Sequence, residues 1–156
     1  MKNKILQSLE SYPFHHKLAT RWRDQDPFRH VNNAIFLSYF EDGRTNLFKR
    51  WSIDYKRRSL IVASIKIDYL EQVDHPSKLV IGQRVSRIGT KSFDIDATIF
   101  NSNAPCCTST VTTVCYDFIL QSEHSWGGVF PVAGFKRNQK KVFTLHPHQA
   151  KTPIII

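Results

Sequence analysis

The sequence predicts an α+β fold in which a five-stranded antiparallel sheet wraps around one long buried helix. Three observations support this: an apolar run with helical spacing covers about residues 33–51, one strand-like segment precedes it, and four strand-like segments follow it. Strands that succeed one another through short turns pair as antiparallel hairpins. Because a helix and a sheet each need a partner to bury their apolar sides, we expect the helix to lie against one face of the sheet.

The first strand is predicted over residues 16–23, where Leu18, Thr20 and Trp22 alternate onto one face. Residues 24–31 are polar and include Pro27, which indicates a loop. Upstream, residues 1–12 have the pattern of a short amphipathic lead-in, and Pro13 would end any helix there.

The helix is predicted from Asn33 to about Trp51. Its apolar stripe consists of Phe36, Phe40, Leu47 and Trp51, widened by Ala34, Ile35, Leu37, Tyr39 and Phe48. An apolar face this broad predicts a helix that is buried on most sides. Either Asn32 or Asn33 can cap the first turn, while Gly43 weakens the middle of the helix by about 1 kcal/mol relative to alanine.

Four more strands are predicted over residues 60–73, 78–88, 92–100 and 108–118, with turns at 74–77, 89–90 and 101–105. Their alternation places Tyr69 and Phe93 on the inward face of the sheet. Residues 121–156 show no clear periodicity. We therefore expect three parts: a lead-in over residues 1–14, one domain over 15–120, and an extension over 121–156. The extension could cover a substrate channel, extend a strand or have no role.

Charge and cysteine content narrow the class of protein. Lys and Arg outnumber Asp and Glu by 22 to 13, for a formal net charge of +9. Such a surface attracts nucleic acid, acidic lipid or a phosphorylated small molecule, although solubility alone explains it equally well. The odd cysteine count, with no metal-finger spacing, indicates a reducing compartment, and we expect Cys115 to be a small buried hydrophobe. No signal-peptide or transmembrane pattern is found, so we expect a cytoplasmic protein with no membrane partner.

The most unusual segment covers residues 24–33. It places Asp24, Asp26, His30, Asn32 and Asn33 between a strand and the start of the helix. A helix start carries free amide donors and partial positive charge, which can stabilise an oxyanion. A nearby carboxylate can activate water or attack directly, and acyl hydrolysis needs both parts. Asp and Asn are also common in turns and caps, so composition alone leaves a structural role open.

The spacing of this segment resembles that of the hotdog-fold thioesterases of the 4-hydroxybenzoyl-CoA thioesterase type. The pattern Asp-x-Asp-x-x-x-His-Val-Asn-Asn is followed by an aromatic-rich helix, here with Glu41 and Arg44, and by a later turn over residues 87–92. The resemblance covers about residues 15–118. Related acyl-carrier-protein thioesterases share the His-Val-Asn-Asn core, so the carrier can be coenzyme A or a protein.

The resemblance implies roles for four residues of the motif. Asp26 corresponds to the catalytic carboxylate, acting as general base or as nucleophile. The Asn33 amide corresponds to the oxyanion donor. His30 and Asn32 correspond to positions that shape the loop and orient the acyl group.

The resemblance also implies how substrate and subunits are arranged. Tyr39 would lie beside the acyl cleft, and Arg87 and Lys91 would meet the phosphates of coenzyme A, although solvated rim charges are an equal alternative. The Glu41–Arg44 pair is better explained by structure than by catalysis. The site would form between two subunits of a homodimer or a dimer of dimers. We expect no cofactor and no metal, because no third ligand at a recognised spacing accompanies His15 and His16, or His146 and His148.

Two other functions compete with a thioesterase. A non-catalytic hotdog module would bind acyl-CoA or an acyl carrier without releasing thiol. A nucleic-acid binder would rest on the net charge alone and would show steep salt dependence. We expect no nucleic-acid partner, and the Asp26 carboxylate favours the enzyme over the binding module.

Overall fold

The computed structural model describes residues 8–51, 58–117 and 122–123. Its elements are η1 (Leu9–Ser11), β1 (Phe14–Ala19), η2 (Trp22–Asp24), α1 (Asn33–Lys49), β2 (Arg58–Tyr69), β3 (Lys78–Ile88), β4 (Ser92–Asn101), β5 (Ala104–Asp117) and β6 (Ser122–Glu123). Half of the predicted lead-in and nearly all of the predicted extension lie outside the described residues.

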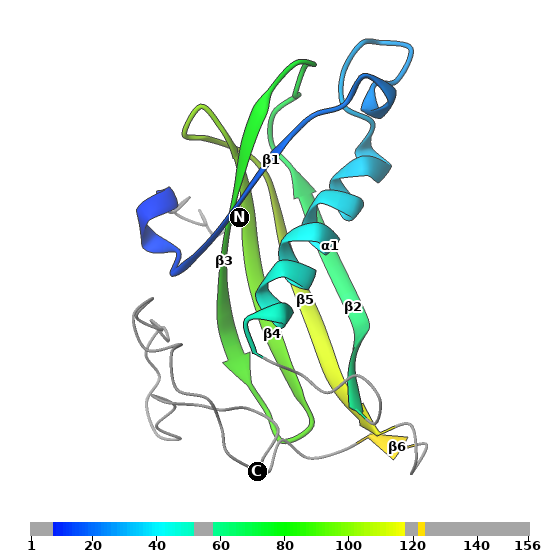
Figure 1. Ribbon diagram of the computed structural model, residues 1–156, viewed down its shortest axis with the longest axis vertical. Helices are drawn as coiled ribbons and strands as arrows, with labels where there is room; N and C mark the ends of the chain where they lie inside the picture. The colour runs from blue at the N-terminus through cyan, green and yellow to red at the C-terminus, as the bar shows by residue number, and fades with distance from the viewer. Residues whose placement is uncertain (1–7, 52–57, 118–121, 124–156) are drawn as a thin grey trace.

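Five long antiparallel strands form the sheet, in the order β1-β3-β4-β5-β2, and the two-residue β6 pairs with the end of β5. Helix α1 runs along one face of this curved sheet (Figure 1). The predicted architecture is therefore confirmed. One connection differs: β2 and β3 follow each other in the chain but do not pair, because residues 70–77 carry the chain from one edge of the sheet to β3 beside β1.

The core lies between α1 and the inner face of the sheet. Phe36 and Phe40 pack against Ile81 and Ile99 near the start of the helix, and a second cluster contains Leu47, Phe48, Val85, Phe93 and Ile95. Burying each such side chain contributes about 1.5–3 kcal/mol. The inward position predicted for Phe93 is confirmed, since it is 2% exposed.

Gly43 lies where helix α1 packs closely against β3. The Gln83 Nε2 group donates to the Gly43 carbonyl at 3.0 Å. A Cβ at position 43 would lie 3.2 Å from both Gln83 Nε2 and Ile81 Cδ1. The glycine that weakens the isolated helix therefore permits close packing of the folded one.

The first strand is shorter than predicted; Leu18 and Thr20 lie on the core side together, as predicted, but Trp22 does not join them. The strand ends at Ala19, and Trp22 belongs to the 3₁₀ turn η2, where it is 79% exposed. The turn forms because the Arg21 amide donates to the Asp24 carboxylate at 2.8 Å. The hydrogen bond from the Arg21 amide to the side chain of Asp24, three residues later, therefore gives a turn where the alternating pattern predicted a strand.

Two other strand boundaries also moved. β2 ends at Tyr69 rather than residue 73. Tyr69 points to the helix side of the sheet, as predicted, where its ring meets that of Phe36, but 46% of it stays exposed. β5 begins at Ala104 rather than residue 108, because Ser102 and Asn103 make the turn alone with φ angles of 49° and 69°.

Helix α1 is less enclosed than predicted. Ala34 is exposed and Leu37 is 41% exposed, so one side of the helix is open in the single chain. The strand β2 shows a related feature, since Ile61, Val62 and Ile65 are each 37–40% exposed. These apolar groups lie at one edge of the sheet and on the open side of the helix.

Candidate active site

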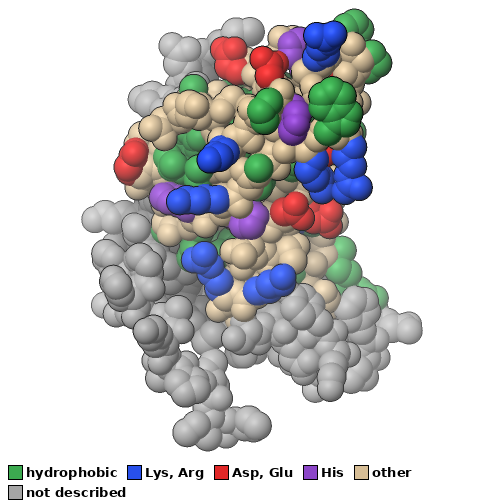
Figure 2. All heavy atoms as spheres, turned by 45° about the horizontal axis from the view of Figure 1, so that its top comes forward, with side chains coloured by type: hydrophobic (Ala, Val, Ile, Leu, Met, Phe, Trp, Pro, Cys, Tyr) green, Lys and Arg blue, Asp and Glu red, His purple; other side chains and the backbone are tan. Residues whose placement is uncertain are grey.

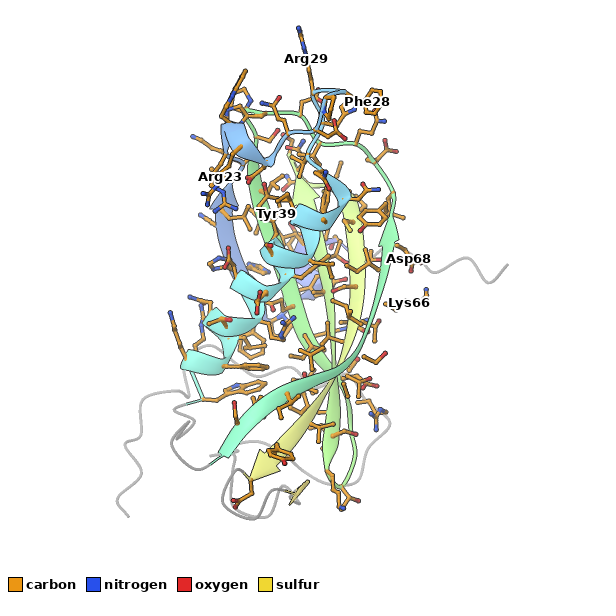
Figure 3. The ribbon with its side chains drawn as sticks, turned by 90° about the vertical axis from the view of Figure 1, so that its right-hand side faces the viewer. Arg23, Phe28, Arg29, Tyr39, Lys66 and Asp68 are labelled. Atoms are coloured by element: carbon orange, nitrogen blue, oxygen red, sulfur yellow. The ribbon has the colours of Figure 1, made fainter. Side chains whose placement is uncertain are left out.

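The loop between η2 and α1 folds back on itself and presents its tip away from the fold. The Asp26 amide donates to the His30 carbonyl at 2.9 Å, and the Arg29 amide donates to the Asp26 carbonyl at 3.0 Å. Arg29 has a φ of 69°, in the left-handed region. Phe28 and Arg29 point outward at the end of the molecule (Figure 3).

The Asp26 carboxylate is partly buried and held by this loop. Its Oδ1 atom accepts the Phe28 amide at 2.8 Å and the His30 amide at 3.4 Å. Both bonds engage Oδ1, and within the described part of the chain Oδ2 accepts none. The arrangement orients the carboxylate while leaving one oxygen available.

The helix start provides an amide donor beside this carboxylate. Asn32 is the N-cap: its side-chain oxygen accepts the Ala34 amide at 2.9 Å, and its carbonyl accepts the Ile35 amide at 2.9 Å. Among residues 8–51, 58–117 and 122–123, no acceptor takes the Asn33 amide. That amide is therefore available to a ligand, as first-turn amides commonly are.

An open pocket of about 650 Å³ joins these groups. One wall is formed by Asp26, Phe28, His30, Val31, Asn33 and Phe36. The other is formed by Tyr69, Leu70, Glu71 and Gln72, at the end of β2 and the start of the crossover. The three predicted catalytic residues, Asp26, His30 and Asn33, thus line the same pocket. Figure 2, which turns this end of the molecule forward, shows hydrophobic, basic, acidic and histidine side chains close together there.

Tyr69 is a pocket residue that the sequence analysis missed. Its hydroxyl donates to the Asn33 carbonyl at 2.9 Å, and its ring meets Phe36 edge to face at 5.7 Å. Burial raises the pKa of Tyr69 above its ordinary value, which keeps the hydroxyl protonated as a donor. The only signal in the sequence was an aromatic residue near the end of a strand pattern. Its contact with the helix start depends on the pairing of β2 with β5, which sets Tyr69 opposite Cys107.

His30 faces the crossover from the other side of the loop. Its Nε2 atom lies 3.6 Å from Asp74 Oδ1, and its side chain is 33% exposed. The next residue, Val31, is buried and donates its amide to the Val73 carbonyl at 2.7 Å. The loop that carries Asp26 is therefore pinned to residues 73–74.

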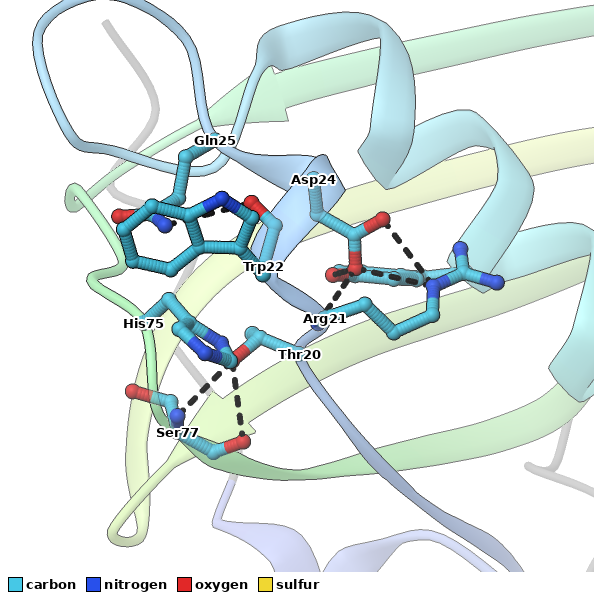
Figure 4. A network of polar contacts seen from close by, with 8 residues as sticks. Thr20, Arg21, Trp22, Asp24, Gln25, His75 and Ser77 are labelled. Atoms are coloured by element: carbon cyan, nitrogen blue, oxygen red, sulfur yellow. Dashed lines mark hydrogen bonds and ion pairs between the residues drawn. The ribbon is translucent and has the colours of Figure 1, made fainter.

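Asp24 and Tyr39 are buried and hydrogen-bonded to each other, away from the pocket. Figure 4 shows the Asp24 carboxylate with its contacts to Arg21. The Tyr39 hydroxyl donates to Asp24 Oδ2 at 2.6 Å, and Arg21 Nε donates to Oδ1 at 3.1 Å. Burial alone would raise the pKa of Asp24, but the bonds from Tyr39 and Arg21 outweigh it and hold this pKa below its ordinary value. Burial, followed by the bond to Asp24, raises the pKa of Tyr39. At 2% exposure Tyr39 lies in the core rather than on the pocket wall, so its predicted contact with substrate has no support in the single chain.

The sequence pattern of the Thioesterase-like superfamily matches residues 20–125 of this chain. The chain belongs to that superfamily. The uncharacterized protein YsmA of Bacillus subtilis (strain 168) is 33% identical to it over 107 residues, which cover 67% of this chain and 73% of YsmA.

Solved structures of other proteins share its fold. The PA5185 protein from Pseudomonas aeruginosa strain PAO1 is 25% identical with a TM-score of 0.69, covering 76% of this chain and 86% of its own. A thioesterase from Thermus thermophilus, solved with coenzyme A and Zn, is 26% identical with a TM-score of 0.69, covering 76% of this chain and 94% of its own. The architecture of this thioesterase-like chain is thus the hotdog fold.

The two cations predicted to bind phosphates lie far from the pocket in this superfamily member. Arg87 and Lys91 flank the β3–β4 turn, whereas the pocket lies by the start of α1, at the opposite end of the sheet (Figure 1). Arg87 is paired with Asp94 through Nε and Nη2, and Nη2 also donates to Ser92 at 3.2 Å. Within one chain the structure does not bring these residues to Asp26.

Other chemistries have little support in the described residues. Cys106, Cys107 and Cys115 are free and buried, which confirms the prediction for Cys115. Burial raises the pKa of Cys106 to about 11 and that of Cys107 to about 12, so neither is an activated thiolate. No group of three metal-ligating side chains is found in the described ranges. None of the helices described there has the length and apolar character to span a bilayer.

Proposed function

We propose that this chain hydrolyses acyl-CoA thioesters, with Asp26 as the catalytic carboxylate and the Asn33 amide as the oxyanion donor. The observation that carries the proposal is the shared pocket. It joins the Asp26 Oδ2 atom to the Asn33 amide, and neither has a hydrogen-bond partner in the part of the chain that the structure describes. Membership in the Thioesterase-like superfamily supports the reaction class. The coenzyme A bound by the Thermus thermophilus protein supports the choice of carrier.

The reaction follows from the positions of these two groups. The thioester carbonyl oxygen would accept the Asn33 amide, and Asp26 Oδ2 would take a proton from water as the water oxygen attacks the carbonyl carbon. The tetrahedral intermediate then expels the coenzyme A thiolate, which takes the proton back from Asp26. The products are a free carboxylic acid and coenzyme A.

A second route uses the same residues. Asp26 Oδ2 could attack the carbonyl carbon itself, expelling the thiolate and forming a mixed anhydride that water later hydrolyses. In either route Asn32 acts through its cap of the first turn and His30 through the loop. Incorporation of ¹⁸O from solvent water into Asp26 during a single turnover distinguishes the nucleophile from the general base.

A homodimer is part of this proposal. Strand β2 forms an edge of the described sheet, and apolar side chains at Ile61, Val62 and Ile65 are exposed along it. An open edge of this kind pairs readily with another strand, and a two-fold axis would set two β2 strands antiparallel. Because Tyr69 ends β2 and lines the pocket, a partner at this edge would lie beside the pocket.

The same pairing gives Arg87 and Lys91 a role. Antiparallel β2 strands would direct the β3–β4 end of one subunit toward the pocket end of the other. Arg87 and Lys91 of a partner would then approach the phosphates of a coenzyme A bound in this pocket. This explains how residues at the far end of one chain could serve the same site.

The deciding experiment is a substrate panel. Purified protein is incubated with acyl-CoAs of several chain lengths and with aryl-CoAs, and free thiol is measured with a chromogenic disulfide. We expect turnover of at least one ester. Thiol release from none of them, together with measurable binding of acyl-CoA by calorimetry, would replace the enzyme with a non-catalytic binding module.

A further inference from the structure

We propose that Asp24 is a positioning residue for the proposed hydrolysis: its buried carboxylate ties the loop that carries Asp26 to helix α1, and so sets Asp26 relative to the Asn33 amide. The catalytic consequence rests on the proposed function. The geometric part can be measured without turnover.

Asp24 is unusual because it is a carboxylate with 0% exposure. Such burial is costly unless the charge is fully paired. Here Oδ2 accepts the Tyr39 hydroxyl at 2.6 Å and the Arg21 amide at 2.8 Å, and Oδ1 accepts Arg21 Nε at 3.1 Å. Packed apolar residues often stabilise a fold as well as a buried ionic group does. Stability alone therefore gives little reason for a carboxylate at this position, whereas a role in holding the loop in place does.

The contacts of Asp24 connect three segments that meet at the pocket end. Its side chain reaches back to Arg21, just after the first strand, and across to Tyr39, in the second turn of α1. Its carbonyl accepts the Asn32 amide at 2.8 Å, so its backbone is also bonded to the helix cap. One residue thus fixes the start of the loop to both the cap and the body of the helix.

Asp26 has no comparable tie among the described residues. The bonds of its carboxylate reach Phe28 and His30, both in its own loop. The loop can therefore keep its internal shape while shifting as a unit relative to α1. The two ends of the loop are attached to the rest of the fold, and these attachments oppose such a shift. Asp24 attaches the first end, and the hydrogen bond from Val31 to Val73 attaches the second.

A purely stabilising role makes a different prediction. If Asp24 only stabilises the fold, molecules that remain folded without its charge should turn over normally. If it positions Asp26, folded molecules should bind substrate normally but react slowly. A displacement of about 1 Å at a reacting group can cost on the order of 100-fold in rate.

The test uses Asp24→Asn and Tyr39→Phe, with Gln83→Leu as the matched control. Gln83 is also buried and also donates to α1, at Gly43, but it lies away from the pocket residues. For Asp24→Asn we expect kcat per folded molecule to fall by about 10- to 100-fold with KM changed less than about threefold. Tyr39→Phe should give a smaller loss of kcat, also with little change in KM. Because the two side chains act through one hydrogen bond, the fold-loss of kcat in the double variant should be smaller than the product of the two single fold-losses. Gln83→Leu should lower stability and leave kcat unchanged.

A second readout does not depend on activity. The backbone amides of Phe28, His30 and Asn33 report the loop and the helix start in amide NMR spectra. We expect Asp24→Asn and Tyr39→Phe to move these resonances and Gln83→Leu to leave them in place. Unchanged resonances together with unchanged kcat would overturn the proposal.

The two proposals fail in distinguishable ways. If the unaltered protein hydrolyses no thioester, the proposed function fails, and the amide resonances still decide whether Asp24 positions the loop. If Asp24→Asn does not fold, Tyr39→Phe alone decides the question. This variant removes only the Tyr39 hydroxyl and keeps the aromatic ring at position 39 and the Asp24 carboxylate. A Tyr39→Phe variant with native resonances and native kcat would then count against positioning.

Discussion

Asp24 and Asp26 lie two residues apart in one segment, but the regions around them are organised in opposite ways. The region of Asp24 is closed: the carboxylate has 0% exposure and accepts bonds from Arg21 and Tyr39. The region of Asp26 is open: its carboxylate lines a pocket and keeps Oδ2 uncommitted among the described residues. Two identical side chains of a short motif thus differ in environment, one buried and hydrogen-bonded and the other on a pocket wall.

The two regions also differ in their relation to a second subunit. The closed region is complete within one chain, whereas the open region borders the exposed edge at β2. We therefore expect changes at the closed region to alter stability and, through the position of the loop, turnover, whereas changes at the open region alter turnover directly or alter assembly. Four predictions test this division, beginning with the largest expected effect.

Asp26→Asn should abolish most activity without unfolding the protein. The amide keeps the shape of the side chain but cannot act as base or nucleophile, so turnover of acyl-CoA should fall by at least about 300-fold. Its thermal unfolding midpoint should stay close to that of the unaltered protein. Asp42→Asn, at an exposed position on α1, is the control and should keep full activity. Normal turnover by Asp26→Asn would remove Asp26 from the mechanism.

Ile65→Lys should weaken the dimer. A lysine in the centre of an apolar edge would place a charge in the subunit interface, raising the dimer dissociation constant by about 30-fold or more. Sedimentation velocity across a concentration series measures this. His15→Lys puts the same side chain on β1, at the other edge of the described sheet, and should leave assembly unchanged. Equal effects of the two variants would contradict the use of the β2 edge.

Asp24 should make stability depend on acid pH. Its pKa is lowered in the folded state, so its ionised form contributes stability above the unfolded value of about 4, and this is lost as pH falls through the folded pKa. At pH 7, Asp24→Asn should lower the free energy of unfolding by about 2 kcal/mol. Urea unfolding at pH 7 and pH 3 should show the difference between the two proteins narrowing at pH 3. A constant difference would show that the charge of Asp24 is not responsible.

Arg87→Ala should weaken substrate binding slightly. If a partner's Arg87 meets the phosphates of coenzyme A, its loss should raise KM about two- to fivefold with kcat unchanged, as for an exposed ion pair. Arg23→Ala is the informative comparison, because Arg23 is an exposed cation at the pocket end of the same chain. A larger effect at Arg23 than at Arg87 would indicate that the phosphates are bound within one chain.

Patterns along the chain were sufficient to predict most elements of this fold and to place three motif residues at one pocket. Periodicity identified the helix from Asn33 and the strands 78–88 and 92–100 almost to the residue, because their residues alternate between core and solvent in a regular way. The spacing of Asp26, His30 and Asn33 was enough to place them together, since all three lie within one loop and the helix start that follows it. Residues that are close in the sequence are held close in space by the backbone, so their arrangement can be predicted from the sequence.

Contacts between distant segments became visible only in the folded chain. Folding placed β2 at the far edge beside β5, so that Tyr69 reaches the Asn33 carbonyl across the pocket, and it placed Tyr39 against Asp24 in the core. It also separated Arg87 from Asp26 by the length of the sheet. These outcomes follow from the order of the strands in the sheet and from the packing of the helix on it. The pattern of residues along the chain does not determine which strands become neighbours, because that depends on contacts between segments far apart in the sequence.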